Sequence, residues 1–175
     1  MGTLKTQEKK IFVIENFLPN LNYYLSDIYK IPLYNNEEYN KKFKKENWPG
    51  MRSGSLYIEN KFLFFLILEN LYKVFFLKNY FLNLYLHLRK QEDGLKDWIH
   101  KDEDDYSFLI YLNNTNLNSG TNLYDEDNNI ISDIKYVQNR FVIYNSSYNH
   151  MGYGHFGDSP VNGRLTLNGF IKVKE

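Results

Sequence analysis

The sequence has no cysteine, no alanine and only four prolines among its 175 residues. Without cysteine, disulfides, thiolate metal ligands and cysteine nucleophiles are excluded, so any bound metal must be held by His, Asp or Glu. The lack of cysteine also suits a reducing compartment, and the polar first ten residues hold no apolar core for a signal peptide. Both observations favour a cytoplasmic protein. The absence of alanine beside abundant Asn, Lys, Ile, Tyr and Phe indicates a coding bias toward AT-rich codons.

Net charge and long apolar runs are also missing. The 21 basic and 21 acidic residues cancel, so no overall field draws the protein to nucleic acid or to an anionic membrane. The most apolar stretch, residues 62–77, is interrupted by Glu69, Asn70 and Lys73 and is shorter than the roughly 20 apolar residues of a spanning helix. We therefore expect no membrane span, and nucleic acid is disfavoured as a partner.

Hydrophobic residues make up 43% of the chain, which is enough for one core at this length. The first half mixes strand and helix signals. Residues 9–19 predict a short strand, and Asn20 is a suitable N-cap for an amphipathic helix over 21–30. A polar helix is expected over 36–45, and a helix apolar on most faces over 63–76, as in a helix that packs against a sheet.

The periodicity changes at residue 81. In FLNLYLHLR, residues 81–89, leucines alternate with polar or aromatic residues, which is the period of a strand. DEDNN at 125–129 predicts a hairpin turn, and further strands are expected at 106–112, 121–124, 130–137, 140–144 and 164–173. The pattern predicts a mainly β fold, a sandwich, barrel or jelly roll, whose flanking N-terminal helices pack on one sheet. We expect a single domain over 1–175, with supporting elements in 1–80 and the strand-rich core in 81–175.

A His-x-Asp motif, His100-Lys101-Asp102, comes just before one of these strands. Two imidazoles and one carboxylate hold Fe(II) on one face and leave the opposite positions open. Residues two apart on an extended strand point the same way, so His100 and Asp102 would converge if the strand continues through them. The third ligand would be His150, which follows a strand and a short turn, or His155, which lies in a glycine-rich loop. We favour His150. His87 is interpreted as an ordinary strand residue.

A possible anion site follows downstream. In RLTLN, residues 164–168, Arg164 and Thr166 share one face of the predicted strand and the leucines share the other. A guanidinium gives a charge-assisted fork for a carboxylate, and a hydroxyl adds one more donor. The order His-x-Asp, then His, then Arg-x-Thr is more informative than any of its parts.

In this order of motifs the chain resembles the iron(II)- and 2-oxoglutarate-dependent oxygenases, most closely their prolyl-4-hydroxylase-like branch. The likeness covers roughly the last half of the chain, with a weaker one in IFVIENFLP near the start. Its matching pieces are His100-Lys101-Asp102, SFLIYLN at 107–113, SGTNLY at 119–124, RFVIYNSSYNH at 140–150 and Arg164-Leu165-Thr166. Ser119 stands where the family usually has the first glycine of a pair.

The resemblance implies a double-stranded β-helix, or jelly roll, with Fe(II) held by His100, Asp102 and His150. It implies 2-oxoglutarate as a cosubstrate that chelates the iron, with its far carboxylate on Arg164. Tyr111 and Thr166 match positions that contact this cosubstrate. With O2 as the second cosubstrate, the implied reaction hydroxylates a C–H bond and releases succinate and CO2. The sequence does not name the substrate: a protein side chain, a free amino acid, a sugar or another small molecule would all be consistent with it.

Some alternatives stay open. Fourteen positions separate His150 from Arg164 and nine separate His155 from it; the shorter gap is nearer to the family's, which keeps His155 as a candidate ligand. Arg52 and Trp48 could face the substrate at the barrel mouth, although Arg52 could equally be a surface ion-pair partner. The alternative function is a non-catalytic jelly-roll or cupin-like protein that binds a metal or another ligand.

Overall fold

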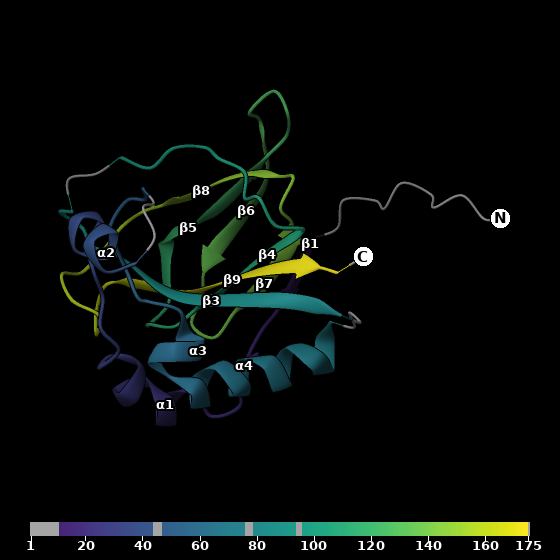
Figure 1. Ribbon diagram of the computed structural model, residues 1–175. Coiled ribbons are helices and arrows are strands. Elements are labelled where there is room, and N and C mark those ends of the chain that lie inside the picture. Colours follow the sequence, from purple (N-terminus) through teal and green to yellow (C-terminus); the bar gives the residue numbers. More distant parts are fainter. Residues whose placement is uncertain (1–10, 44–46, 76–78, 94–95, 175) are drawn as a thin grey trace.

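The computed structural model describes residues 11–43, 47–75, 79–93 and 96–174 as two β-sheets, with three of the four described helices on the outer side of the larger one (Figure 1). The helices are α1 (Leu21–Ile28), α2 (Asn36–Lys42), α3 (Leu56–Glu59) and α4 (Lys61–Val74). The strands are β1 (Ile11–Ile14), β2 (Met51–Arg52), β3 (Tyr80–Arg89), β4 (Tyr106–Tyr111), β5 (Asn116–Tyr124), β6 (Ile130–Tyr136), β7 (Phe141–Asn145), β8 (Asn149–Tyr153) and β9 (Arg164–Val173).

Both sheets are antiparallel. The larger has the order β1-β7-β4-β9-β3-β2, and the smaller has the order β6-β5-β8. Strands that are neighbours in the sequence therefore often lie in different sheets, as expected when two sheets face each other in a jelly roll. The predicted mainly β fold with flanking helices is confirmed.

The alternating pattern of β3 decides which side of the large sheet meets the helices. Leu84, Leu86 and Leu88 are fully buried and share one hydrophobic cluster with Ile67 and Leu71 of α4. The same cluster takes in Leu165 and Leu167 of β9, which pairs with β3 along its whole length. The side chains between these leucines consequently point to the other face, toward the smaller sheet.

The ends of some predicted elements differ from the structure. Asn20 is in the left-handed conformation, φ 55°, and its side chain forms no cap hydrogen bond; α1 is stabilised by packing instead. Side-chain caps are found at α2, where Asn35 and Glu38 form a capping box, and at α4, where the Asn60 side chain accepts from the Leu63 N–H. The ends of the helices predicted at 36–45 and 63–76 fall partly on residues 44–46 and 76, outside the described residues, as do residues 9 and 10 of the first strand.

Three short elements were not predicted: β2, α3 and β8. Each is stabilised by contacts with neighbouring elements, and its own sequence shows only a weak hydrophobic pattern. Among the helices of the described residues, none is both long enough and apolar enough to cross a membrane.

Candidate metal centre and its cavity

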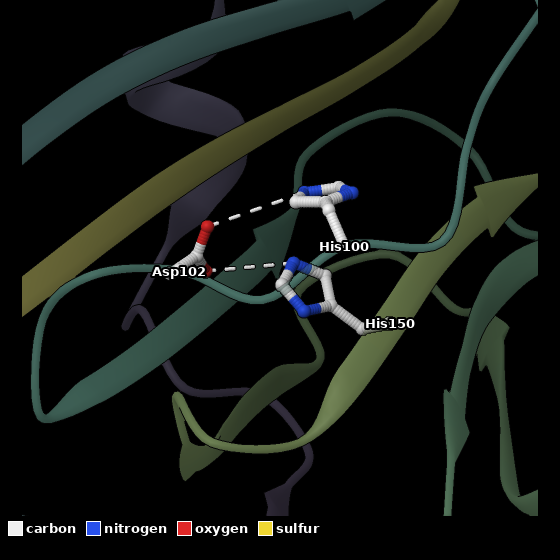
Figure 2. A group of neighbouring side chains, drawn as sticks. All are labelled: His100, Asp102 and His150. Carbon is white, nitrogen blue, oxygen red and sulfur yellow. Dashed lines mark ion pairs between the residues drawn. The ribbon is translucent and has the colours of Figure 1, made fainter. Parts of the chain in front are cut away.

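The structure brings together His100, Asp102 and His150 (Figure 2). One ligand atom from each lies within 4.8 Å of the others. An Asp102 carboxylate oxygen is 3.4 Å from His150 Nε2, and its other oxygen is 4.0 Å from His100 Nε2. This is the two-imidazole, one-carboxylate donor set that the sequence suggested for iron.

The convergence has a different cause from the one expected. No continuous strand runs through His100 and Asp102 in the part of the chain that is described. Instead His100 forms an isolated bridge with His150, each backbone N–H donating to the other's carbonyl at 3.1 and 2.8 Å. His150 itself lies on β8, which pairs with β5. The bridge therefore fixes the two imidazoles opposite each other, with ring centres 4.3 Å apart.

Both imidazoles are oriented for metal binding. His100 Nδ1 lies 2.9 Å from the Trp98 carbonyl, and His150 Nδ1 lies 3.3 Å from the Tyr148 carbonyl. A carbonyl only accepts, so each Nδ1 carries the proton and each Nε2 keeps its lone pair on the side of Asp102. This arrangement of outer hydrogen bonds is the usual support of metal-binding histidines.

Asp102 is held by Ser107 at the start of β4. The Ser107 hydroxyl donates to Asp102 Oδ2 at 2.5 Å and lies 2.8 Å from the hydroxyl of Ser146. Ser107 is buried, so this contact ties the carboxylate of the loop to the rigid sheet. Ser107 was not among the predicted site residues, because a lone serine in a strand gives no signal.

Burial shapes the electrostatics of this centre. It lowers the pKa of His150, an effect that the Asp102 carboxylate opposes and that His100 reinforces. Burial also raises the pKa of Tyr144, whose ring lies 5.2 Å from that of His150, and the charge of Asp102 adds to this. These shifts favour the neutral forms of the His150 imidazole and the Tyr144 phenol.

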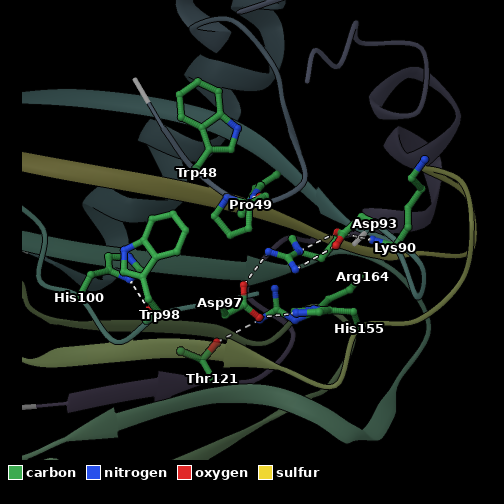
Figure 3. Close-up of polar contacts among 12 residues, drawn as sticks. Trp48, Pro49, Lys90, Asp93, Asp97, Trp98, His100, Thr121, His155 and Arg164 are labelled. Carbon is green, nitrogen blue, oxygen red and sulfur yellow. Dashed lines mark hydrogen bonds and ion pairs between the residues drawn. The ribbon is translucent and has the colours of Figure 1, made fainter. Parts of the chain in front are cut away.

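His155 lies apart from this group. Its Nε2 contacts the Asp97 carboxylate, whose other oxygen accepts from Arg89 at 2.6 Å (Figure 3). Burial opposes ionisation of Asp97, but the bond with His155 and the Arg89 charge hold its pKa below the ordinary value. The structure therefore uses His155 in a half-buried polar cluster with Asp97 and Arg89, and places His150 with the other two candidate ligands.

Arg164 lines the same cavity and is 4% exposed. One guanidinium nitrogen donates to the Gly120 carbonyl at 2.8 Å and to the Thr121 hydroxyl at 3.2 Å. Its Nε is buried without a hydrogen-bond partner in the described part of the chain. A Cβ at Gly152 would lie 3.0 Å from the guanidinium, so β8 leaves room for it. A buried cation with a spare donor beside a cavity suits an anionic ligand.

Tyr111 and Thr166 lie near Arg164. The Tyr111 hydroxyl donates to Thr121 at 2.9 Å, so it reaches Arg164 through Thr121, which lines the cavity. Burial raises the pKa of Tyr111, which keeps the phenol a donor. Thr166 also lines the cavity, and its hydroxyl donates to Asn168 at 2.7 Å. Of the three predicted cosubstrate residues, Arg164 and Thr166 therefore line the cavity, whereas Tyr111 is fully buried behind Thr121 and is not among the lining residues.

The cavity that joins these groups has a volume of about 650 Å³, within the range of roughly 300–1,000 Å³ for small-molecule sites. Its long wall is the β3–β9 ladder, where the cross-strand pairs Arg89–Arg164, His87–Thr166, Tyr85–Asn168 and Asn83–Phe170 face the smaller sheet. Arg52 and Trp48 also line the cavity. His87 also lines the cavity, although the sequence suggested an ordinary strand residue. It is one of the residues that alternate with the leucines in β3, and this was the sequence feature that could have indicated its position.

His87 offers a test of this wall by pH. Its Nε2 lies 2.5 Å from the Pro49 carbonyl, and burial lowers its pKa to about 3. The unfolded chain takes up a proton near the ordinary value of about 6.5, whereas the folded chain does not. Stability is therefore lost as the pH falls from about 6.5 toward 3, by up to about 1.4 kcal/mol per pH unit. Urea unfolding of wild type and His87→Gln, which keeps an N–H donor, should show a shallower acid loss in the variant; equal pH profiles would contradict a neutral buried His87.

Comparison with known proteins supports the fold. The chain matches no protein-family model, and no curated protein is similar to it in sequence. A prolyl-4-hydroxylase from Pseudomonas putida superposes with a TM-score of 0.57 at 14% identity, over 94% of this chain and 93% of that one. A 2OG-Fe(II) oxygenase family oxidoreductase from Burkholderia pseudomallei gives 0.60 at 10% identity, over 93% and 84%.

A prolyl hydroxylase from Trichoplax adhaerens, in complex with a peptide fragment of a hypoxia inducible factor, gives a TM-score of 0.53 at 14% identity, over 93% of this chain and 83% of that one. Together these likenesses show a jelly roll of the type found in 2OG-Fe(II) oxygenases. The resemblance to the prolyl-4-hydroxylase-like branch is confirmed at the level of the fold.

Proposed function

We propose that the protein is an Fe(II)- and 2-oxoglutarate-dependent dioxygenase that hydroxylates a C–H bond of its substrate and releases succinate and CO2. The observation that carries the proposal is the preorganised group of His100, Asp102 and His150, with both Nε2 atoms and the carboxylate converging. Arg164, which lines the same cavity, adds a buried cation for a dicarboxylate. We expect this activity in the cytoplasm and from residues 1–175 as one domain.

Each group of the chain has a definable part in this function. His100, Asp102 and His150 would hold the iron, with Ser107 and the two carbonyls at Trp98 and Tyr148 fixing their orientation. When bound, the iron supplies the redox chemistry that couples decarboxylation of 2-oxoglutarate to insertion of one oxygen atom of O2 into a C–H bond.

The remaining groups would bind and orient the cosubstrate. Arg164 would hold its far carboxylate by charge-assisted hydrogen bonds, with Tyr111 and Thr166 supporting this end of the cavity. Burial of Arg164 would strengthen this ion pair by lowering the local dielectric constant. The substrate remains to be identified as a small molecule or a protein side chain; the Trichoplax enzyme with its bound peptide makes the latter one candidate.

Anaerobic titration of 2-oxoglutarate into the Mn(II)-loaded protein tests the proposal. Mn(II) replaces Fe(II) without oxidation, so binding is separated from turnover. We expect 2-oxoglutarate to bind in the presence of metal and to lose roughly tenfold or more in affinity when the metal is removed by a chelator, because the chelating end loses its partner. Equal binding with and without metal, or none at all, would contradict the proposed function.

A further inference from the structure

A tyrosine in the cavity wall, Tyr144 of β7, is not used by the function proposed above. It is 1% exposed and lines the cavity, and its ring shares a hydrophobic cluster with Leu109 and Val142. Within the described residues, the Tyr144 hydroxyl has no hydrogen-bond partner. A buried hydroxyl without a partner is destabilising, and in a cavity wall this cost is removed when a bound ligand supplies the acceptor.

The register of the strands places Tyr144 beside the candidate metal ligands. Its cross-strand partner on β4 is Ser107, and the side chains of directly opposed residues in an antiparallel pair share one face. Ser107 holds the Asp102 carboxylate, and the ring centre of Tyr144 lies 5.2 Å from that of His150. The phenol therefore adjoins two of the three candidate ligands, and its hydroxyl forms no hydrogen bond with either of them.

The surroundings of Tyr144 keep its hydroxyl a hydrogen-bond donor. Burial raises the pKa of this phenol well above its ordinary value, the Asp102 charge raises it further, and the Arg164 charge opposes this. The hydroxyl therefore keeps its proton at neutral pH. It also lies within electrostatic range of both the carboxylate that would hold the metal and the guanidinium that would hold the far carboxylate of the cosubstrate.

A chelating 2-oxo acid supplies the missing acceptor. When such a ligand binds a metal through its keto oxygen and one carboxylate oxygen, the second carboxylate oxygen keeps its lone pairs. A neutral hydroxyl suits this oxygen, because a hydrogen bond to a charged acceptor is roughly twice as strong as one to a neutral acceptor. Resting on the proposed function, we infer that Tyr144 binds the cosubstrate, its hydroxyl donating to the carboxylate at the metal-binding end of the 2-oxo acid.

Two 2-oxo acids separate this role from that of Arg164. 2-Oxoglutarate has both carboxylates, and 2-oxovalerate has the same carbon chain without the far carboxylate. Each acid is titrated anaerobically into the Mn(II)-loaded protein. We expect Tyr144→Phe to weaken binding of both acids by the same factor, about tenfold or more, which corresponds to the loss of one hydrogen bond to a charged group. Arg164→Gln is expected to weaken binding of 2-oxoglutarate alone.

Metal affinity and folding are measured on the same proteins. Tyr144→Phe should bind Mn(II) as wild type does, because its hydroxyl is not a ligand of the metal. Its apo form should unfold at the wild-type temperature or above it, because phenylalanine keeps the ring and removes an unpaired hydroxyl. Tyr124→Phe is the matched control: Tyr124 is buried on β5 and lies outside the cavity lining, so this variant should bind both acids as wild type does.

The outcomes distinguish this inference from the proposed function. If wild type binds no 2-oxoglutarate in the presence of metal, both are refuted. If wild type binds it and Tyr144→Phe binds both acids with wild-type affinity, only the role of Tyr144 is refuted. A loss confined to 2-oxoglutarate would assign the hydroxyl to the far carboxylate, and a loss together with a lower unfolding temperature would give Tyr144 a packing role; either result overturns the inference. Wild-type binding of 2-oxoglutarate without binding of 2-oxovalerate also overturns it, because every group proposed to hold the metal-binding end is then present.

Discussion

Replacing His150 by alanine lowers the affinity for Mn(II) or Fe(II) by at least about a hundredfold, whereas replacing His155 by glutamine leaves it unchanged. Loss of an outer hydrogen bond alone costs roughly 10- to 100-fold in metal affinity, so loss of a ligand should cost more. His150 Nε2 lies 3.4 Å from Asp102, while His155 is bound to Asp97 in a separate cluster. Glutamine at 155 retains a donor for Asp97. Metal affinity is measured by competition with a chelating dye.

Because His150 is buried, a loss of metal affinity in His150→Ala could come from misfolding. His100→Ala removes another proposed ligand, and it should perturb packing little because the His100 side chain is 41% exposed. Thermal unfolding of the apo proteins shows whether each variant is folded. Retained metal affinity in a folded His150→Ala protein, or its loss in His155→Gln, would give the ligand role to His155 and reverse the assignment.

Replacing Arg164 by glutamine is expected to weaken 2-oxoglutarate binding roughly 10- to 100-fold while the metal still binds. A hydrogen bond to a charged group contributes about 1.5–3 kcal/mol, and the Arg164 guanidinium is a buried cation that lines the cavity beside Thr121. The quantity to measure is the dissociation constant of 2-oxoglutarate from the Mn(II) form under anaerobic conditions.

Arg140→Gln is the matched control for this change. It removes the same charge from the β6–β7 turn, where Arg140 pairs with Glu15 and binds the Lys135 carbonyl. Its cosubstrate affinity should equal that of wild type. Unchanged 2-oxoglutarate binding in a folded, metal-competent Arg164→Gln protein would place the carboxylate elsewhere, with Arg89 as the next cation to test.

The elements predicted best are those in which the hydrophobic pattern of the sequence directly reflects how the element packs. The leucines of β3 alternate because one face of the strand is covered by α4, so the sequence reveals both the strand and its buried side. The turn at 125–129 is equally local: Asp125 accepts from the backbone of Asp127 and Asn129, and Asn128 has φ 63°. Local interactions of this kind depend on a few consecutive residues, so the sequence alone predicts them.

The strand β8 was missed for the opposite reason. Residues 149–153 show no alternation and include Gly152, so they were interpreted as part of a loop. Their strand conformation comes from pairing with β5, where Gly152 lies opposite Thr121 and leaves room for Arg164. A strand that exists because of its partner, and a glycine required by a distant guanidinium, cannot be read from their own neighbours in the sequence.

The sequence by itself determined the kind of chemistry available to this protein: oxygen and imidazole donors in place of thiolates, a His-x-Asp pair, and an arginine on a polar strand face. These follow from residue identity and from the period of two. Only the tertiary structure decided which histidine joins the pair, because the His100–His150 bridge is made between segments 50 residues apart. It also decided that Ser107, His87 and Arg52 belong to the same cavity. Such contacts depend on which strands become neighbours, and that is fixed by the packing of the whole chain and not by any local pattern.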